Sequence, residues 1–301
     1  MRLNNTFKVT IVAILVIAMA LALSGCASPT PTTTPGTTIT PTPSAPVKLT
    51  LATTTSVDDT GLLAYLKSDF DSKYNANLVW TAVGSGQAIA LGKSGDADVL
   101  IVHSPKDETA FMNDGYGANR TQFAHNFYVI VGPANDPAGI KNMTNASQAF
   151  DKIRKSESSF ISRGDASGTN AKELTLWNMT GYTPSNVTDK DWYKATGRGM
   201  GATLITANEM QAYTLSDIST FIHNQKNVTL TLLVENDPRN LINNYDIITL
   251  NQTRFPDKNH VGALDLVEYL TSHDTQVKIS EFGVKEYGKP LFYADLLNAT
   301  T

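Results

Sequence analysis

Short apolar runs of strand length alternate along the chain with segments whose apolar residues recur at helical spacing. The first run, Lys48–Ala52, precedes Leu62, Leu63, Leu66 and Phe70, which predicts a strand followed by a helix. The same alternation predicts another helix through residues 88–91 and further strands at residues 78–83, 99–102, 127–131, 159–161, 230–234 and 245–250. Strands that alternate with helices indicate an α/β fold of parallel sheets flanked by helices.

Four hydroxyl residues, Thr53–Ser56, stand where the first predicted strand passes into the first predicted helix. The first N–H groups of a helix have no intrahelical partner and carry the positive end of the helix dipole, so they can donate to an anion. The hydroxyl side chains add further donors. The alternative is that Thr55 or Ser56 only caps the helix, because Ser and Thr are preferred cap residues.

Two other strand-to-helix passages are also rich in hydrogen-bond donors. Residues 160–169 combine Arg163, Ser167 and Thr169 with glycines, and the arginine adds a fixed positive charge with N–H groups suited to an oxyanion. The third passage carries Ser85 between two glycines. Independent helix caps would not explain the arginine or the glycines that clear an approach. The three passages together therefore favour an anion-binding site.

The N-terminal segment indicates export. Arg2 and Lys8 precede an uncharged run, residues 9–23, that suits the apolar core of a secretory signal. The run ends in Leu-Ser-Gly-Cys, which resembles the lipobox of lipoproteins, so we expect residues 1–25 to be a signal peptide. We expect Cys26 to be lipidated and to anchor the exported chain to the outer face of the cytoplasmic membrane; the alternative is a free thiol beside an ordinary cleavage site. As the only cysteine, it leaves no disulfide framework and no thiolate metal site.

The segment after the cysteine has the composition of a tether. Residues 27–46 hold eight Thr, six Pro and two Ser and no charged or aromatic side chain, so we expect residues 26–46 to link the lipid to the folded part. Without the signal peptide the chain has 22 basic and 28 acidic residues, which does not indicate a nucleic-acid partner. Sequons for glycosylation, which predict exposed acceptors on a glycoprotein, lie at Asn119, Asn142, Asn145, Asn178, Asn186, Asn227, Asn251 and Asn298.

Several segments resemble the tungstate-binding proteins of bacterial and archaeal ABC importers. They cover most of residues 48–250 and are Thr53–Ser56, Thr60–Leu63, Val83–Gly92, Asp98–His103, Ser162–Thr169, Gly197–Gly201 and Ala212–Asp217. The chain departs from the family at Ala166, where members often have a second acid, and at Asn170, where they often have a histidine. We therefore expect neither position to be an essential ligand.

The resemblance implies a two-lobed fold of the type II periplasmic-binding-protein kind. Its sheets would be mixed, mostly parallel and flanked by helices, with the ligand in the cleft between the lobes. We expect lobe 1 to comprise residues 47–127 and 250–301 and lobe 2 to comprise residues 128–249. The crossing points would be the extended segments 127–131 and 245–250, which could act as hinges.

The predicted oxyanion site draws on both lobes and consists of Thr54, Thr55, Ser56, Ser85, Arg163, Ser167, Gly168, Thr169 and Thr214. Thr214 could equally belong to a helix cap. Tungstate and molybdate are fully ionised near pH 7 and only accept hydrogen bonds, whereas hydrogen phosphate also needs an acceptor. Asp165 would favour phosphate if it pointed into the cleft and would form a turn if it bonded local N–H groups; the resemblance favours the turn.

The resemblance implies a non-enzymatic receptor without cofactor or metal, which works as a monomer with the permease and ATPase of an ABC importer. The alternatives are a binding protein for phosphate or sulfate and an exported serine hydrolase. Residues 164–168 superficially resemble a nucleophile turn, but they are not Gly-x-Ser-x-Gly and no histidine stands in a recognised relation to them. The five histidines also lack metal-ligand spacing. The sequence does not separate tungstate from molybdate, whose charge and shape are nearly identical.

Overall fold

The computed structural model describes most of the chain beyond the predicted tether, namely residues 45–182, 190–235 and 237–297. Residues 44–301 form one unit. The predicted signal peptide, the predicted lipidation site Cys26, all but the last two residues of the predicted tether, and the sequons Asn186 and Asn298 lie outside the described residues. None of the helices in the described ranges is long and apolar enough to cross a membrane.

The strands of the described part are β1 (Val47–Thr54), β2 (Ala76–Val83), β3 (Val99–Val102), β4 (Gly117–Gly132), β5 (Phe160–Ser162), β6 (Tyr193–Ala195), β7 (Thr214–Asp217), β8 (Thr231–Val234), β9 (Ile242–Leu250) and β10 (Tyr293–Ala294). The sequence-predicted strands are confirmed. The first of them runs two residues further than expected, so Thr53 and Thr54 belong to the strand and not to the turn after it. The strands β6, β7 and β10 were not predicted, and neither were residues 117–126 of β4.

The helices of the described part are α1 (Thr55–Asp58), α2 (Leu62–Tyr74), α3 (Ser85–Ser94), α4 (Pro105–Asn113), α5 (Ala146–Lys155), α6 (Gly168–Met179), α8 (Met200–Glu209), α9 (Ile218–Asn224), α10 (His260–Thr271), α11 (His273–Glu281) and α12 (Val284–Tyr287). The helices predicted around Leu62–Phe70 and residues 88–91 are confirmed as α2 and α3.

The strands form a large sheet and a small one. The large sheet has the order β10-β4-β9-β3-β1-β2, and β7 and β8 pair with the other end of β4. β1 is parallel to β2 and β3, and β5 is parallel to β6, whereas β9 is antiparallel to β3 and β4. The sheets are mixed as expected, but β4 is also antiparallel to β7, β8 and β10, so the expectation of mostly parallel sheets was wrong for the described strands. An apolar run does not encode the direction of its neighbour.

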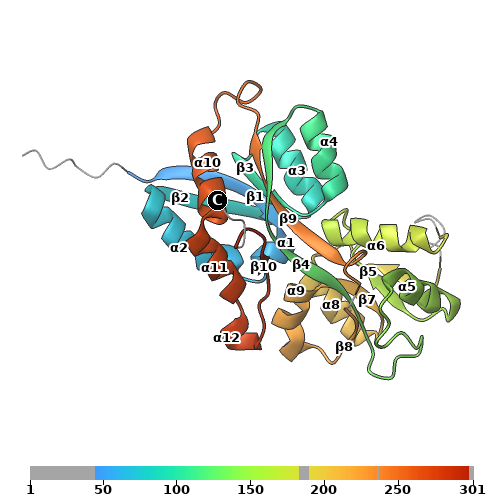
Figure 1. Cartoon of the computed structure of the whole chain (residues 1–301). Coiled ribbons are helices and arrows are strands. Elements are labelled where there is room, and N and C mark those ends of the chain that lie inside the picture. The colour runs from blue at the N-terminus through green and yellow to red at the C-terminus, as the bar shows by residue number, and fades with distance from the viewer. Residues whose placement is uncertain (1–44, 183–189, 236, 298–301) are drawn as a thin grey trace, which may run out of the picture. The chain divides into compact units, whose positions relative to one another are not determined.

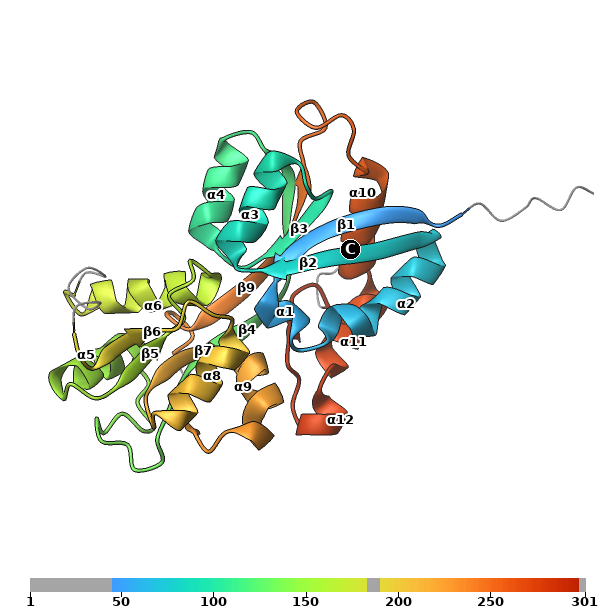
Figure 2. The ribbon, with the colours of Figure 1, turned by 180° about the vertical axis from the view of Figure 1, so that it is seen from behind.

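The strand β4 connects two groups of elements (Figures 1 and 2). Its residues 117–127 pair with β9 beside β1–β3, and its residues 128–132 pair with β7 and β8. The pairing places residues 242–249 alongside β3 and β4. The lobe boundaries at 127/128 and 249/250 stay a prediction.

Buried apolar residues fill each group. One cluster joins β1, α2 and α10 and continues to α8 and α9, a second lies around Phe150 and Trp177, and a third lies between α3, α4 and β3. In the third cluster α3 lies close on the sheet because Gly92 has no side chain: a Cβ there would be 2.8 Å from Leu100 Cδ1. This close packing holds α3 against β3.

Candidate functional site

The first half of the site lies at the carboxyl ends of three parallel strands. Thr54 ends β1 and pairs with Val83, the last residue of β2, so the starts of α1 and α3 lie beside each other. His103 directly follows β3, the other neighbour of β1. Ligands of open α/β sheets bind outside the carboxyl ends of their strands, so this edge of the sheet is a candidate site.

The second half lies at the carboxyl ends of β5 and β6. The backbone N–H groups of Thr196 and Gly197 donate to the carbonyls of Ser162 and Arg163, at 3.0 and 2.7 Å, and hold the two connecting segments together. One of these segments leads into α6 and the other into α8. The N-cap residues of α8 and α3 are Gly199 and Gly84, so neither helix has a side-chain cap.

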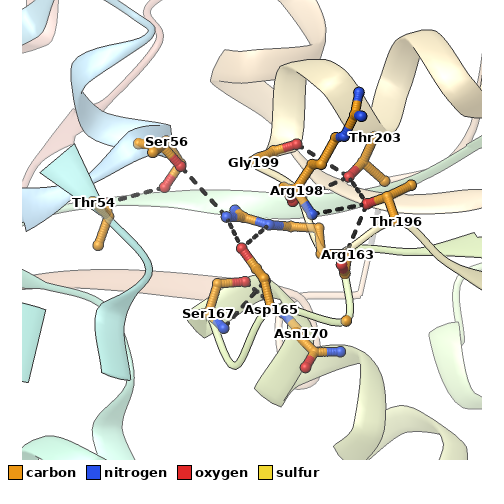
Figure 3. Close-up of polar contacts among 12 residues, drawn as sticks. Thr54, Ser56, Arg163, Asp165, Ser167, Asn170, Thr196, Arg198, Gly199 and Thr203 are labelled. Carbon is orange, nitrogen blue, oxygen red and sulfur yellow. Dashed lines mark hydrogen bonds and ion pairs between the residues drawn. The ribbon is translucent and has the colours of Figure 1, made fainter. Parts of the chain in front are cut away.

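The two halves meet in closely packed contacts. Gly84 packs against the other half, since a Cβ there would be 3.4 Å from the Asp165 carbonyl oxygen, and one on Gly199 would be 3.4 Å from Thr55 Oγ1. Arg163 Nη2 lies 3.4 Å from the same Thr55 hydroxyl. In Figure 3 the Arg163 side chain points toward the segment that carries Thr54 and Ser56, with Asp165 beside it. The starts of α1, α3, α6 and α8 therefore converge.

Three hydroxyls on the segments that meet here are buried and have no hydrogen-bond partner among the residues that the structure describes. They are Thr53 Oγ1, Ser85 Oγ and Thr169 Oγ1, and their side chains are at most 1% exposed. A buried hydroxyl without a partner costs roughly 1–3 kcal/mol, and native structures rarely leave such groups unsatisfied. Ser85 and Thr169 lie in the first turns of converging helices, and Thr53 lies near the end of the adjoining strand β1, which indicates that a group that accepts hydrogen bonds belongs there.

Arg163 is the buried cation of the site. It is only 2% exposed, and its Nη2 and Nε lie 2.6 and 3.2 Å from Asp165 Oδ2. The other carboxylate oxygen of Asp165 accepts from the Ser167 backbone N–H at 3.3 Å. Asp165 therefore forms the local turn, the role that the resemblance favoured, and in addition it neutralises the guanidinium.

Buried polar groups beneath α6 fix the Arg163 segment. Ser167 Oγ accepts from the Asn170 backbone N–H at 3.2 Å and so caps the helix, which leaves the hydroxyl proton of Ser167 free to donate. Ser162 Oγ accepts from the Gly164 N–H and donates to Glu173 at 2.6 Å. Burial raises the pKa of Glu173, although hydrogen bonds from Ser162 and other side chains oppose the shift.

In the first half, Thr54 and Ser56 are tied to His103. Thr54 Oγ1 lies 3.1 Å from Ser56 Oγ, which lies 3.0 Å from His103 Nε2. The other ring nitrogen, Nδ1, lies 2.9 Å from Asn243 Oδ1 and 3.1 Å from the Tyr128 hydroxyl. Burial lowers the pKa of His103 from its usual range to about 4.

The structure thus brings eight of the nine predicted ligand residues to the place where the two halves meet. The exception is Thr214, which opens β7 opposite Val131 and whose hydroxyl contacts the Leu215 carbonyl. At about 3.3 Å per strand residue it lies roughly 10 Å from the carboxyl end of β7. Its assignment to the site stays a prediction, and no contact in the described chain supports it.

The sequence analysis missed three side chains of this region. Thr53 was part of the hydroxyl run but was not assigned as a ligand, and His103 and Asn243 were not assigned to the site at all. The position of His103 directly after a buried strand was a usable signal, because residues after neighbouring parallel strands share one edge of the sheet. In the described ranges no cluster of three or more His, Cys, Asp or Glu side chains could hold a metal ion.

Two groups of α/β elements, joined through a mixed sheet and facing each other with donor-rich helix starts, define a solute-binding protein of the type II periplasmic-binding-protein fold. The family model described as "PBP superfamily domain" matches residues 30–274. The chain is 42% identical to the tungstate-binding protein TupA of Peptoclostridium acidaminophilum, over 81% of this chain and 84% of that one. It belongs to the PBP superfamily and, within it, to the same family as the TupA proteins.

Two further relatives agree with this assignment. The tungstate-binding protein TupA of Campylobacter jejuni is 35% identical over 80% of this chain and 88% of that one. The solved structure of TupA from Desulfovibrio alaskensis G20 is 39% identical, has a TM-score of 0.70 and corresponds to 83% of this chain and 99% of that one. The shared fold therefore extends over nearly the whole of the solved structure.

Proposed function

We propose that the protein is an extracytoplasmic receptor that captures tungstate or molybdate between its two halves and delivers the anion to the permease and ATPase of an ABC importer. The observation that carries this proposal is the set of buried, unpartnered hydroxyls of Thr53, Ser85 and Thr169 on segments that meet the segment of the buried Arg163. The names of the relatives, tungstate-binding TupA proteins, support the same ligand.

The charge of the site favours a fully ionised anion over hydrogen phosphate. Hydroxyls and helix starts donate, and the acid beside them, Asp165, already accepts from Arg163 and the Ser167 N–H. Hydrogen phosphate carries a proton that needs an acceptor, and three of the roughly four lone-pair sites of the Asp165 carboxylate are already occupied. Because an anion held by both halves gains contacts only when they meet, its binding stabilises the closed arrangement that the permease would recognise.

The proposal includes a lipid anchor at Cys26 after removal of residues 1–25, and a tether of residues 26–46. Four sequon asparagines, Asn119, Asn142, Asn178 and Asn227, are exposed, and Asn145 and Asn251 are half-buried, which supports glycosylation at the exposed positions. Globomycin-sensitive maturation and membrane release of a Cys26→Ala variant would test the anchor. Light scattering would test the proposed monomer.

We also propose that the protein is not an enzyme, although Ser56, His103 and Asn243 follow one another as a nucleophile, a base and its orienting group would. Ser56 is fully buried, and its oxygen is also in contact with the Thr54 hydroxyl. A hydrolase needs an accessible nucleophile. Release of nitrophenol from nitrophenyl esters that is abolished by Ser56→Ala would contradict this part of the proposal.

The decisive experiment is calorimetry of the mature chain with tungstate, molybdate, sulfate and phosphate. We expect saturable one-site binding of tungstate and molybdate and much weaker binding of hydrogen phosphate. Trp80 and Trp177 provide a fluorescence readout of the same titrations. If the folded protein binds none of these oxyanions, the proposed function is refuted. If it binds phosphate more tightly than tungstate and molybdate, phosphate is the ligand instead.

A further inference from the structure

A continuous series of hydrogen-bonded side chains connects the two halves of the molecule behind the site. Every member is at most 2% exposed, and in order they are Asp217, Ser219, Asn126, Asn243, His103, Ser56 and Thr54. The two asparagines face each other across the β4–β9 pairing. This buried chain of side chains, which we call the relay, ends at two of the hydroxyls predicted to bind the anion.

The direction of the hydrogen bonds in the relay is fixed at its Asp217 end. The Asp217 carboxylate accepts from the Ser219 hydroxyl at 2.6 Å and from the backbone N–H and hydroxyl of Thr220 at 2.9 and 2.7 Å. The single proton of Ser219 is thereby used, so Ser219 Oγ must accept its next bond, at 3.0 Å, from the amide nitrogen of Asn126. The amide oxygen of Asn126 then points to Asn243.

The donor and the acceptor of each following hydrogen bond in the relay are determined by the bond before it. The Asn126 oxygen accepts from Asn243 Nδ2 at 2.8 Å, and Asn243 Nδ2 also lies 2.9 Å from the Tyr245 hydroxyl. The oxygen of Asn243 is therefore the atom that faces His103 Nδ1, at 2.9 Å, and it can only accept. A hydrogen must stand on Nδ1, and the neutral ring has its lone pair on Nε2.

The His103 ring is neutral at pH 7 because it is buried, and burial disfavours its charged form. Burial lowers the pKa of His103 to about 4, against the raising effects of Asn243, Asp217 and Asp165 and together with the lowering effect of Arg163. A neutral Nε2 accepts, so the Ser56 hydroxyl donates to it. The Ser56 oxygen then accepts from Thr54, whose hydroxyl is the free end of the relay.

We infer that His103 is a positioning residue whose Nε2 accepts the hydrogen bond of the Ser56 hydroxyl, so that Ser56 meets the anion through its backbone N–H and Thr54 is the hydroxyl that turns to the anion. The two hydroxyls differ in the hydrogen bonds that are lost when each rotates toward the anion. Thr54 can rotate without disturbing any other relay bond, whereas Ser56 would leave the buried His103 Nε2 without a donor. The statement about the anion rests on the proposed function, but the direction of the relay does not.

Nitrogen NMR of the ligand-free mature chain tests the direction of the relay. Long-range proton–nitrogen correlations at pH 7 should show the neutral Nδ1–H form for His103, assigned by its absence in His103→Gln among the five histidines. Tyr128→Phe is the matched control, because its hydroxyl lies 3.1 Å from the same nitrogen but outside the relay, and it should leave the form unchanged. An Nε2–H form or an imidazolium at pH 7 would overturn the inference.

Tungstate calorimetry tests the division between the two hydroxyls. Thr54→Val, which keeps the shape, should weaken binding about tenfold or more relative to Ser56→Ala, since a hydrogen bond to a charged group is lost only in the former. An equal or larger loss in a folded Ser56→Ala would overturn the inference. If the wild-type protein binds no tungstate, the proposed function fails, while the NMR result still decides the direction of the relay.

Discussion

The two halves of the site offer the anion different chemistry. The half at the ends of β1, β2 and β3 presents neutral hydroxyls, two of which are oriented from behind by His103. The half at the ends of β5 and β6 presents a buried guanidinium that already has a counter-ion, Asp165. The first half supplies hydroxyl donors in fixed orientations. The second half supplies a positive charge, and the ion pair with Asp165 offsets the cost of burying that charge. Substitutions that remove charge and substitutions that remove a hydroxyl should therefore have distinguishable effects.

The largest effect should come from Arg163→Ala. We expect tungstate affinity to fall by about 1.5–3 kcal/mol, or roughly tenfold to 150-fold, because a charge-assisted contact is lost and Asp165 is left as an uncompensated negative charge beside a dianion. Calorimetry measures the change, and circular dichroism controls for folding. The double variant Arg163→Ala, Asp165→Ala should recover part of the loss. Unchanged tungstate affinity in a folded Arg163→Ala variant would show that the charge of the second half does not contribute to anion binding.

The next effect concerns how closely the halves approach. Gly168 starts α6, and a Cβ there would lie 2.5 Å from the His103 carbonyl oxygen of the other half, so Gly168→Ala should separate the halves and weaken binding by about 1–3 kcal/mol. Gly199→Ala is the matched control, since its Cβ would make an ordinary contact of 3.4 Å with Thr55 Oγ1. Similar affinities for the two variants would show that close approach at Gly168 is not needed.

A comparison of single hydroxyls tests whether both halves donate. Ser85→Ala removes an unpartnered hydroxyl from the first half, and Thr169→Val removes one from the second without changing the shape. We expect each to weaken tungstate binding by about 1.5 kcal/mol, or roughly tenfold, and to leave or raise thermal stability without ligand, because a buried unsatisfied group is removed. A loss confined to one variant would assign the hydroxyl donors to that half alone.

The smallest effect should appear in stability and not in binding. Behind the first half, burial and the neighbouring Asp246 raise the pKa of Glu108, with Arg120 in opposition. The folded protein therefore holds a proton that the unfolded chain releases above pH 4.5, and the free energy of unfolding should fall as the pH rises from about 5 to 8. Glu108→Gln should flatten this fall by up to about 1.4 kcal/mol per pH unit. Parallel denaturation curves for both proteins would contradict the shift.

Much of the fold could be predicted because the spacing and the length of the apolar runs match the strands and helices of the structure. Lys48–Ala52 and residues 88–91 predicted β1 and α3, and the hydroxyls after the first run predicted a donor-rich helix start. The antiparallel direction of β9 beside β3 was not readable, since a strand buried on both faces has the same apolar pattern in either direction. The four-residue strand β7 was too short and too polar to be recognised.

The amino-acid sequence by itself determined which segments carry donors, namely the passages around Thr55, Ser85 and Arg163, because helix starts and hydroxyl or guanidinium groups are local features. Only the tertiary structure decided which donors face one ligand and which are already used. His103, Asn126, Asn243 and Asp217 are far apart in sequence, and the paired strands β4 and β9 bring them into one buried relay. A hydrogen bond depends on distance and direction between atoms, which sequence spacing does not specify across a sheet.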